Sequence, residues 1–345
     1  MLFRSQQTTA PNGWMSATNL PVTNTVLGVA APSYALDTGT FPSENQLADV
    51  TMEDSLQSST GFTSVSLSET SVGVIVFEWV AGNGSPANLN NITPLLAQAA
   101  LSGGLFLSQF TGNPADTINV YAAGRDFDSG TRLSELTEVG LSPFAGIQQI
   151  FPIVSGTAGA AGSSITAIKL WPQQTVLGQV FAIGGSGFAS GGTLADNLAT
   201  PGASTAAVSG PGILPAEEVV FGAPGHLVGY LGRNDASRAC KTTSIAGNTA
   251  HRMTFNGVAD WVGPILANGN PTSYNDAVVT EGSYSLWEYE RLAYRSTYGT
   301  SSPNGKAVAD KIANNIITTS ASVSGTTLGA MNVSKSVEGG LITHL

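Results

Sequence analysis

Charged residues and cysteine are both scarce in this chain. Only 10% of its 345 residues are Asp, Glu, Lys or Arg, against about 25% in an ordinary soluble domain, so Ser, Thr, Asn and Gly must supply much of the polar surface. The single cysteine, Cys240, excludes an intrachain disulfide and a cysteine-based metal cluster, and we expect a small buried thiol there. The formal net charge of -10 leaves no basic patch for nucleic acid or for an anionic membrane surface.

Long hydrophobic runs are absent as well. No run of about 18 apolar residues occurs, so the sequence predicts no membrane span. The opening stretch MLFRSQQTTAPNGW lacks the apolar core of a signal peptide, which means that an exported form would have lost its leader. The low charge and the abundance of Ser, Thr and Asn are common in secreted proteins. The length is sufficient for one large domain or two smaller ones, each with its own core.

What the chain does contain is an alternation of strand-like and helix-like segments. GVIVFEWV (residues 73–80) is apolar and rich in β-branched residues, which predicts a buried strand. Thr93 and Pro94 then open LLAQAALSGG with a capping residue and a proline suited to the first helical position. INVYAAG and LSELTEVG (residues 133–140) repeat the strand and helix pair. This order predicts an α/β protein with a mixed or mostly parallel sheet flanked by helices.

The second half of the chain continues the pattern less regularly. TAIKLWP and QVFAIGG predict further strands, and GGSGFASGGTLADNLA predicts a glycine-led helix. The small-residue stretch SGTAGAAG predicts a surface loop. GKAVADKIANNI is expected to form an amphipathic helix because Val308, Ile312 and Ile316 recur every four residues. The Ser-, Thr- and Gly-rich tail after Ile317 is expected to be weakly structured.

The short run GRDFDSGTR (residues 124–132) concentrates charge at a predicted junction of strand, loop and helix. The first N–H groups of a helix lack intrahelical partners and carry the positive end of its dipole. Gly130 lets a ligand approach the backbone closely, Ser129 and Thr131 add hydroxyl donors, and Arg125 adds a guanidinium fork. These groups predict an anion-binding cradle. The alternative, a serine cap beside a surface arginine, remains open on spacing alone.

The R-x-x-x-S-G-T pattern after a strand resembles the second phosphate-holding segment of the phosphate-binding proteins of ABC uptake systems. LADVTMEDS resembles the segment of that family in which an aspartate contacts phosphate, here Asp54. LFRSQ at the N-terminus resembles the end of the first phosphate loop, which leaves Leu2 and Phe3 as its remnant. GVIVFEWV, NITPLLAQAALSGG, GGSGFASGGTLADNL and GHLVGYLG fit the same family in the same order.

Three departures from the family pattern stand out. The family usually places an aspartate two residues after the arginine, whereas this chain has Phe127 there, between Asp126 and Asp128. The glycine-serine-threonine part of the first loop is missing. GSYSLWEYERLAYR (residues 282–295) is richer in aromatics than its counterpart, and its cluster of four is expected to be core and interface: Tyr284, Trp287, Tyr289 and Tyr294.

The resemblance implies a two-lobe periplasmic-binding-protein-like (class II) fold with mixed sheets, flanking helices and a central cleft. Lobe 1 would combine residues 1–77 and 255–345, and lobe 2 would span residues 78–254, with crossings near Glu78 and in HRMTFNG. It further implies non-catalytic capture of phosphate or a similar tetrahedral oxyanion in the periplasm or outside the cell, with no cofactor or metal. The ligand-binding residues it implies are Arg125, Ser129, Gly130, Thr131, Asp54 and Phe3. An ABC permease or a second copy of the chain are the implied partners.

Within that picture, the expected role of Asp54 is to accept a hydrogen bond from a protonated oxyanion and to repel sulfate, which carries no proton at neutral pH. Taken on its own, Asp54 fits a solvated loop acid or a helix cap better than a ligand-binding residue.

Enzymatic readings of the sequence lack support. There is no G-x-S-x-G elbow, GTSSPNGKA is not a P-loop, and DFDSGTRLSELT does not match a calcium loop. The three histidines are scattered along the sequence: His226, His251 and His344. A phosphatase-like activity would need a nucleophile or metal cluster that we do not find. The alternative from another class is a secreted structural or filament-forming surface protein that retains the binding-protein fold, which the low charge and the truncated first loop leave open.

Overall fold

The computed structural model describes residues 50–60, 63–127, 129–176, 179–202, 225–319 and 326–345, and, before residue 50, the short strands β1 (Thr23–Asn24) and β2 (Val29–Ala30). Phe3, Asp128 and most of the loop expected after residue 200 lie outside these ranges.

The centre of the molecule is a sheet of eight strands in the path β3-β16-β4-β12-β7-β6, with β13 beside β4 and β5 beside β13. Its strands are β3 (Val50–Glu53), β4 (Leu67–Ala81), β5 (Asn91–Ile92), β6 (Leu105–Phe106), β7 (Asn119–Ala123), β12 (Gly225–Gly232), β13 (His251–Phe255) and β16 (Trp287–Arg295). The pairs β12–β7 and β13–β5 are parallel, and the other pairs in this sheet are antiparallel. The predicted α/β class with a mixed sheet is therefore confirmed, although antiparallel pairing dominates.

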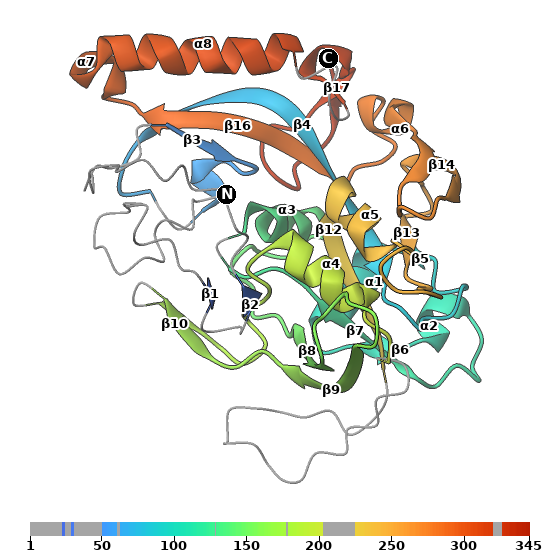
Figure 1. The fold of residues 1–345 in the computed structure, drawn as a ribbon. Coiled ribbons are helices and arrows are strands. Elements are labelled where there is room, and N and C mark those ends of the chain that lie inside the picture. Colours follow the sequence, from blue (N-terminus) through green and yellow to red (C-terminus); the bar gives the residue numbers. More distant parts are fainter. Residues whose placement is uncertain are drawn as a thin grey trace.

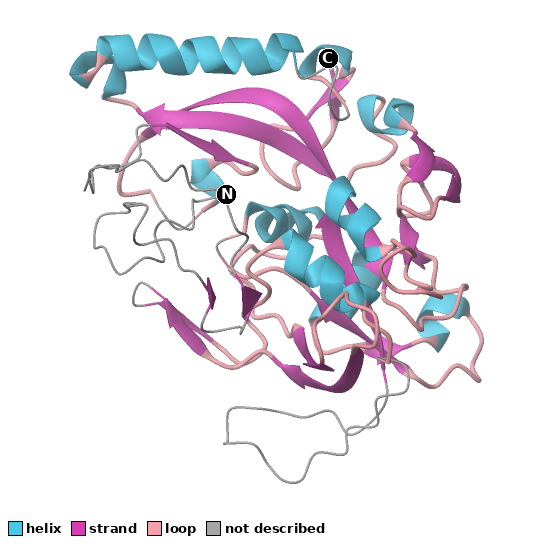
Figure 2. Cartoon of the chain, in the orientation of Figure 1, coloured by secondary structure: helices cyan, strands magenta, loops and turns pink. Residues whose placement is uncertain are grey.

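Helices and small hairpins cover this sheet (Figure 2). The helices are α1 (Pro94–Leu101), α2 (Ser108–Thr111), α3 (Gly130–Glu138), α4 (Gly191–Ala199), α5 (Arg233–Ala239), α6 (Asp276–Thr280), α7 (Tyr298–Ser301) and α8 (Pro303–Thr319). The hairpins pair β8 (Ile150–Ser155) with β9 (Ser164–Leu170), β10 (Gln174–Val176) with β11 (Gln179–Phe181), β14 (Trp261–Ile265) with β15 (Pro271–Tyr274), and β17 (Val333–Ser334) with β18 (Thr343–His344). The loop between β8 and β9 contains the predicted surface loop SGTAGAAG.

β4 is the longest strand and takes part in both ends of the sheet. Its first part, from Leu67 to Val76, pairs with β16, and its last part pairs with β12 and β13. The two predicted lobe crossings meet here, because Trp79 of β4 lies opposite Met253 of β13. The lobe boundaries at residues 78 and 255 stay a prediction.

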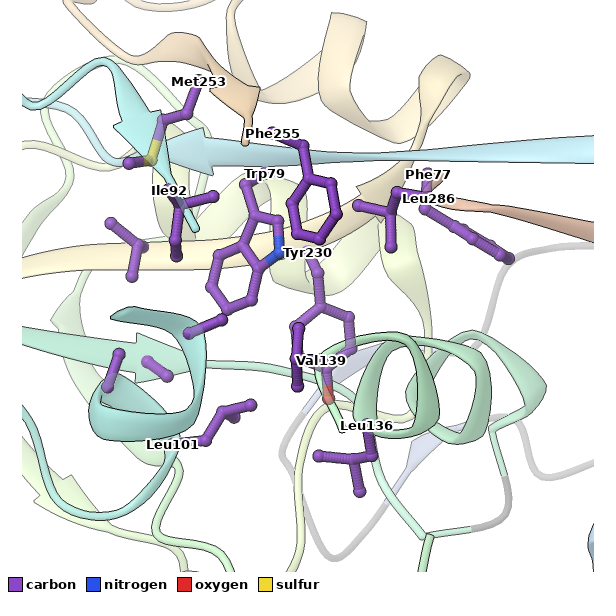
Figure 3. Close-up of a cluster of buried hydrophobic side chains, with 14 of the residues drawn as sticks. Phe77, Trp79, Ile92, Leu101, Leu136, Val139, Tyr230, Met253, Phe255 and Leu286 are labelled. Atoms are coloured by element: carbon purple, nitrogen blue, oxygen red, sulfur yellow. The ribbon is translucent and has the colours of Figure 1, made fainter. Parts of the chain in front are cut away.

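Alternate residues of β4 enter two hydrophobic clusters on the two faces of the sheet. Phe77 and Trp79 pack with α1 and α3, in the cluster that Figure 3 shows around Trp79 and Tyr230. Val80 packs with Leu194 of α4 and Ala236 of α5 in the other cluster. Three of the aromatic residues expected in the core, Tyr284, Trp287 and Tyr294, are buried, and so is Cys240. Burial raises the pKa of the Cys240 thiol to about 12, so it remains an inert thiol.

A buried charged cluster joins the strands at the predicted crossings. Glu78 of β4 and Arg252 of β13 form an ion pair of 2.6 Å with both side chains fully buried. Arg233 forms an ion pair of 2.7 Å with Asp260, whose side chain is also fully buried. Burial and the nearby charge of Asp260 raise the pKa of Glu78 to about 8 in spite of Arg252. Burial beside a second carboxyl group thus opposes the charged form of Glu78, and the contact with Arg252 offsets this only in part.

The helix predicted over GKAVADKIANNI (residues 305–316) is confirmed as part of α8, but of its predicted apolar stripe only Ile316 packs against the core. Figure 1 shows α8 lying along β16 and β4. Ala309 and Ala313 are the buried residues of α8 in the cluster with Leu292 and Tyr294, whereas Val308 and Ile312 are 59% and 42% exposed. Alanines allow the helix backbone to approach the sheet closely, so this helix packs through its small residues.

The expectation of a weakly structured tail is wrong for residues 326–345. Val333 is fully buried, and Lys335 inserts its ammonium group between α3 and β16. The Lys335 Nζ donates to Glu138 Oε2 at 2.6 Å and to the backbone oxygens of Ser285 and Trp287. Glu338 accepts from the backbone N–H of Leu56 at 2.6 Å and pairs with Arg291 at 3.1 Å. The tail thus ties the segment after β3 to α3 and β16.

Candidate functional site

The run 124–132 folds as the sequence predicts. β7 ends at Ala123, Arg125 forms a parallel bridge with Phe188, and α3 begins at Gly130. Ser129 is the N-cap of α3: it has extended backbone angles and its Oγ accepts the N–H of Arg132 at 3.4 Å. The Ser129 hydroxyl is therefore engaged in the helix cap. Asp126, beside it in the loop, is also buried.

The guanidinium of Arg125 is held by neutral groups. Its Nε donates to the carbonyl oxygen of Phe188 at 3.1 Å, its Nη2 to that of Ala189 at 3.3 Å, and its Nη1 to Thr131 Oγ1 at 3.4 Å. The residue is only 7% exposed, and among the described residues it makes no ion pair. A guanidinium keeps its charge in proteins, and leaving a buried charge without a counter-charge is strongly unfavourable. The reading of Arg125 as a surface arginine is wrong.

Asp54 approaches the same helix start from the other end of the sequence. It follows β3, and its Oδ2 accepts a hydrogen bond from Thr131 Oγ1 at 3.3 Å. Its backbone oxygen accepts from Ser134 Oγ, also at 3.3 Å. A Cβ at Gly130 would lie 1.5 Å from Asp54 Oδ1, so any larger residue there would displace the Asp54 carboxylate. With 8% exposure, Asp54 is a buried acid placed against a helix N-terminus, where the dipole favours negative charge.

The structure thus brings four predicted site residues into one corner: Arg125, Gly130, Thr131 and Asp54. Ser129 lies next to them as the helix cap, and Phe3 lies outside the described residues. In the absence of an aspartate at position 127, the guanidinium is braced by the Phe188 and Ala189 carbonyls, and Phe127 instead stacks on Phe181 with ring centroids 4.0 Å apart.

Two further acids near Asp54 were not predicted. Glu53 is 1% exposed and Glu290 lies on β16, the strand that pairs with β3. Burial raises the pKa of each to about 7, and the charge of Asp54 contributes to both shifts. The sequence gives no local signal for this grouping, because it arises from the pairing of strands that are far apart in the chain.

A second helix start repeats the arrangement on the other side of Arg125. Ser190 caps α4 by accepting the N–H of Thr193 at 3.1 Å, and a Cβ at Gly191 would lie 2.0 Å from Asp235 Oδ2. The pKa of Asp235 is raised by burial and held down in part by Arg125 and Arg238. Arg125 therefore lies between two capped helix starts, each facing an aspartate. The GGSGFASGGT pattern indicated the helix but not its relation to Arg125.

Other chemistry is not evident in the described part of the chain. Its Asp, Glu, His and Cys side chains form no group of three or more that could hold a metal ion. None of its helices is long and apolar enough to cross a membrane.

No protein-family model matches this sequence, and no curated protein matches it significantly. Solved structures of similar shape do match. One is an ABC-type phosphate transport receptor from Vibrio cholerae, at 12% identity and a TM-score of 0.38, covering 79% of this chain and 78% of that one. Another is PstS from Borrelia burgdorferi, at 14% identity and a TM-score of 0.36, covering 79% and 74%. A third, from Clostridium perfringens and solved with bound phosphate, has 11% identity and a TM-score of 0.41, covering 79% and 76%.

Proposed function

We propose that this chain is an extracytoplasmic solute-binding protein that reversibly captures phosphate or a similar tetrahedral oxyanion at the corner of Arg125, Gly130, Thr131 and Asp54. The observation that carries the proposal is the state of Arg125. Its guanidinium is buried, it is held by two carbonyls and a hydroxyl, and no described carboxylate pairs with it. The charges of Asp54 and Asp235 lie near enough to interact with Arg125, but no described carboxylate is in ion-pair contact with its guanidinium, so an anionic ligand at this place would make that direct contact.

The start of α3 supplies the remaining donors. The first N–H groups of α3 have no intrahelical partners, Ser129 caps that of Arg132, and the Thr131 hydroxyl lies 3.4 Å from the guanidinium. The predicted lobes also meet here, because Asp54 belongs to residues 1–77 and Arg125 to residues 78–254. An oxyanion bound between them would be enclosed by lobe closure, as in other proteins with a hinged cleft.

Asp54 would give the site its choice of ligand. Its carboxylate lies on Thr131 and Gly130, so an incoming oxyanion must lie against it. A protonated phosphate oxygen can donate a hydrogen bond to this carboxylate, whereas sulfate would face it without a proton. We expect the capture to be non-catalytic and to need no cofactor, with an ABC permease as the receiving partner.

Isothermal titration calorimetry on the purified chain tests the proposal. Phosphate is expected to bind saturably at one site at pH 7, with sulfate at least about tenfold weaker, which corresponds to roughly 1.4 kcal/mol. The absence of heat and of thermal stabilisation with phosphate, phosphonates and sulfate would show that the proposal is wrong.

A second candidate function is favoured by one feature of the same corner. Asp54, Phe188 and Ala189 already accept hydrogen bonds from the donors that a ligand would use, so the corner can serve as an internal cross-link. In that case the chain is a secreted structural or surface protein that associates with copies of itself. Light scattering and negative-stain microscopy of the same sample separate the two functions, since a filament-forming protein would give polymers and no response to phosphate.

A further inference from the structure

The backbone around Arg125 is enclosed by a ring of hydrogen bonds from two buried side chains. The N–H of Arg125 donates to Tyr230 Oη at 3.1 Å, and this hydroxyl donates to Gln149 Oε1 at 2.8 Å. Gln149 Nε2 completes the ring by donating to the carbonyl oxygen of Arg125 at 2.9 Å. Tyr230 and Gln149 are both fully buried. Both polar groups of the Arg125 backbone are thus held by one connected pair of side chains, and the carbonyl oxygen also accepts from Arg132 Nη1 at 3.3 Å.

The fit of this ring against the chain is close. A Cβ added at Gly124 would lie 1.8 Å from Gln149 Oε1 and 2.5 Å from Tyr230 Oη. From the opposite side, a Cβ at Gly187 would lie 2.2 Å from the carbonyl oxygen of Arg125. A larger residue at Gly187 would therefore push against the backbone of Arg125, and one at Gly124 would displace the ends of the Gln149 and Tyr230 side chains. The backbone of Arg125 therefore has little room to shift.

The ring is anchored in the largest hydrophobic cluster. Tyr230 extends from β12, and its ring makes an edge contact with Trp79, with centroids 5.5 Å apart (Figure 3). Burial raises the pKa of Tyr230 to about 12, so its hydroxyl keeps its proton and can accept from Arg125 while donating to Gln149.

The same arrangement fixes the guanidinium. Phe188 donates its N–H to the carbonyl oxygen of Gly124 at 2.8 Å, and its own carbonyl oxygen accepts from Asp126 N and from Arg125 Nε, each at 3.1 Å. Because residues 124–126 are hydrogen-bonded to Phe188, fixing the backbone at Arg125 also fixes the Phe188 carbonyl that orients its guanidinium. All of these partners are neutral, so the bracing leaves the positive charge of Arg125 intact, whereas an acid would reduce it.

We propose that Tyr230 and Gln149 are positioning residues that aim the Arg125 guanidinium at Thr131 and the start of α3 without neutralising it. The expected effect on phosphate binding rests on the proposed function, whereas the effect of the ring on Arg125 can be measured without a ligand.

The first experiment compares two buried tyrosines. Tyr230→Phe removes the hydroxyl from the ring and keeps the aromatic packing. Tyr284→Phe is the matched control, because Tyr284 is also fully buried and its hydroxyl donates to the Phe77 carbonyl at 2.7 Å, away from Arg125. In calorimetric titration with inorganic phosphate, Tyr230→Phe is expected to weaken affinity about tenfold, as for the loss of one well-placed hydrogen bond. Tyr284→Phe is expected to stay within about twofold of wild type.

The second experiment needs no phosphate. Hydrogen exchange at the Arg125 Nε–H, followed by nitrogen-15 NMR, is expected to be at least about tenfold faster in Tyr230→Phe than in wild type or Tyr284→Phe. Gln149→Met breaks the ring from its other side and is expected to produce the same two changes, which covers the case in which Tyr230→Phe does not fold.

The outcomes separate the two proposals. The positioning role of Tyr230 and Gln149 is overturned if Tyr230→Phe and Gln149→Met leave the exchange rate at Arg125 Nε–H unchanged and bind phosphate as tightly as Tyr284→Phe does. A wild-type protein that binds no phosphate overturns the proposed function, and the exchange rates alone then decide whether the ring orients Arg125.

Discussion

Thr131 donates a hydrogen bond of 3.3 Å to Asp54 across 77 positions of sequence, and Arg125 Nη1 donates to the same Thr131 oxygen. The hydroxyl therefore links a buried cation to a buried anion. Its proton points to the carboxylate, because the guanidinium can only donate. We consequently expect changes at Asp54 to alter which anion binds and changes at Arg125 to alter how tightly it binds.

The variant Asp54→Asn should alter ligand choice. It keeps the shape of the side chain but removes its charge and adds an N–H donor, so sulfate no longer meets a carboxylate. We expect the ratio of phosphate to sulfate affinity to fall by about tenfold or more, mainly through tighter sulfate binding. Calorimetry with both anions at pH 7 measures the ratio. Asp310→Asn, on the outer side of α8 beside Lys306, is the control and should leave it unchanged. A ratio in Asp54→Asn equal to the wild-type ratio would remove Asp54 from the site.

The variant Arg125→Ala should weaken the affinity for phosphate. Removing one partner of a buried charged pair costs on the order of 2–5 kcal/mol of binding free energy. Calorimetric titration of phosphate into this variant measures the loss, with Lys311→Ala as a control that removes one positive charge from the exposed surface of α8. Phosphate affinity in Arg125→Ala that matches Lys311→Ala contradicts our placement of the site.

A third prediction concerns pH and Glu135 of α3. This carboxyl is fully buried and accepts from Trp79 Nε1 at 2.6 Å, and burial raises its pKa to about 8 from an ordinary value of 4.5. The folded state thus binds a proton that the unfolded state releases above pH 4.5, so the contribution to stability is complete below that pH and is lost as the pH rises toward 8. At about 1.4 kcal/mol per pH unit, the loss from pH 6 to pH 9 is on the order of 2–3 kcal/mol.

Glu135→Gln should remove that part of the pH dependence, because the amide oxygen still accepts from Trp79 and cannot ionise. Chemical denaturation at pH 6 and pH 9 gives the difference in unfolding free energy. The exposed Glu281→Gln serves as the control. Parallel loss of stability in wild type and Glu135→Gln would mean that Glu135 is already ionised in the folded protein.

A fourth prediction concerns Lys335 in the tail. Its buried ammonium group pairs with Glu138 and lies 3.4 Å from Glu288, so Lys335→Met leaves carboxyl groups without their cation. Breaking a buried pair in this way costs about 3–5 kcal/mol of unfolding free energy. Urea denaturation measures it, and the exposed Lys311→Met should cost less than about 0.5 kcal/mol. Equal midpoints for the two variants would show that the tail contributes no stability.

The sequence predicted best where the signal is local. Thr93 accepts the N–H of Leu96 at 3.3 Å and Ser129 caps α3, because a capping side chain acts within its own turn. The grouping of Arg125, Thr131 and Asp54 was predicted through the family resemblance, and the contacts between them could not have come from spacing alone.

The features that the sequence did not predict depend on tertiary packing. Tyr230 reaches Arg125 across 105 positions, and Glu290 comes near Asp54 only through the pairing of β16 with β3. For α8, hydrophobicity indicated Val308 and Ile312, while the geometry of the sheet selected the smaller Ala309 and Ala313. In the tail, polar composition suggested exposure, yet Lys335 is buried because four acceptors surround its charge.

The tail also governs the order of events during synthesis. Glu338 accepts the N–H of Leu56 across 282 residues, and Lys335 reaches Glu138 across 197. A ribosome must therefore have translated beyond codon 338 before the backbone that follows β3 can be held at Leu56, however much of the intervening chain has already emerged. Closure of loops this large is slow compared with the formation of single helices or hairpins. Nascent molecules will spend their elongation time incomplete, and final assembly is a single late step rather than a progressive one.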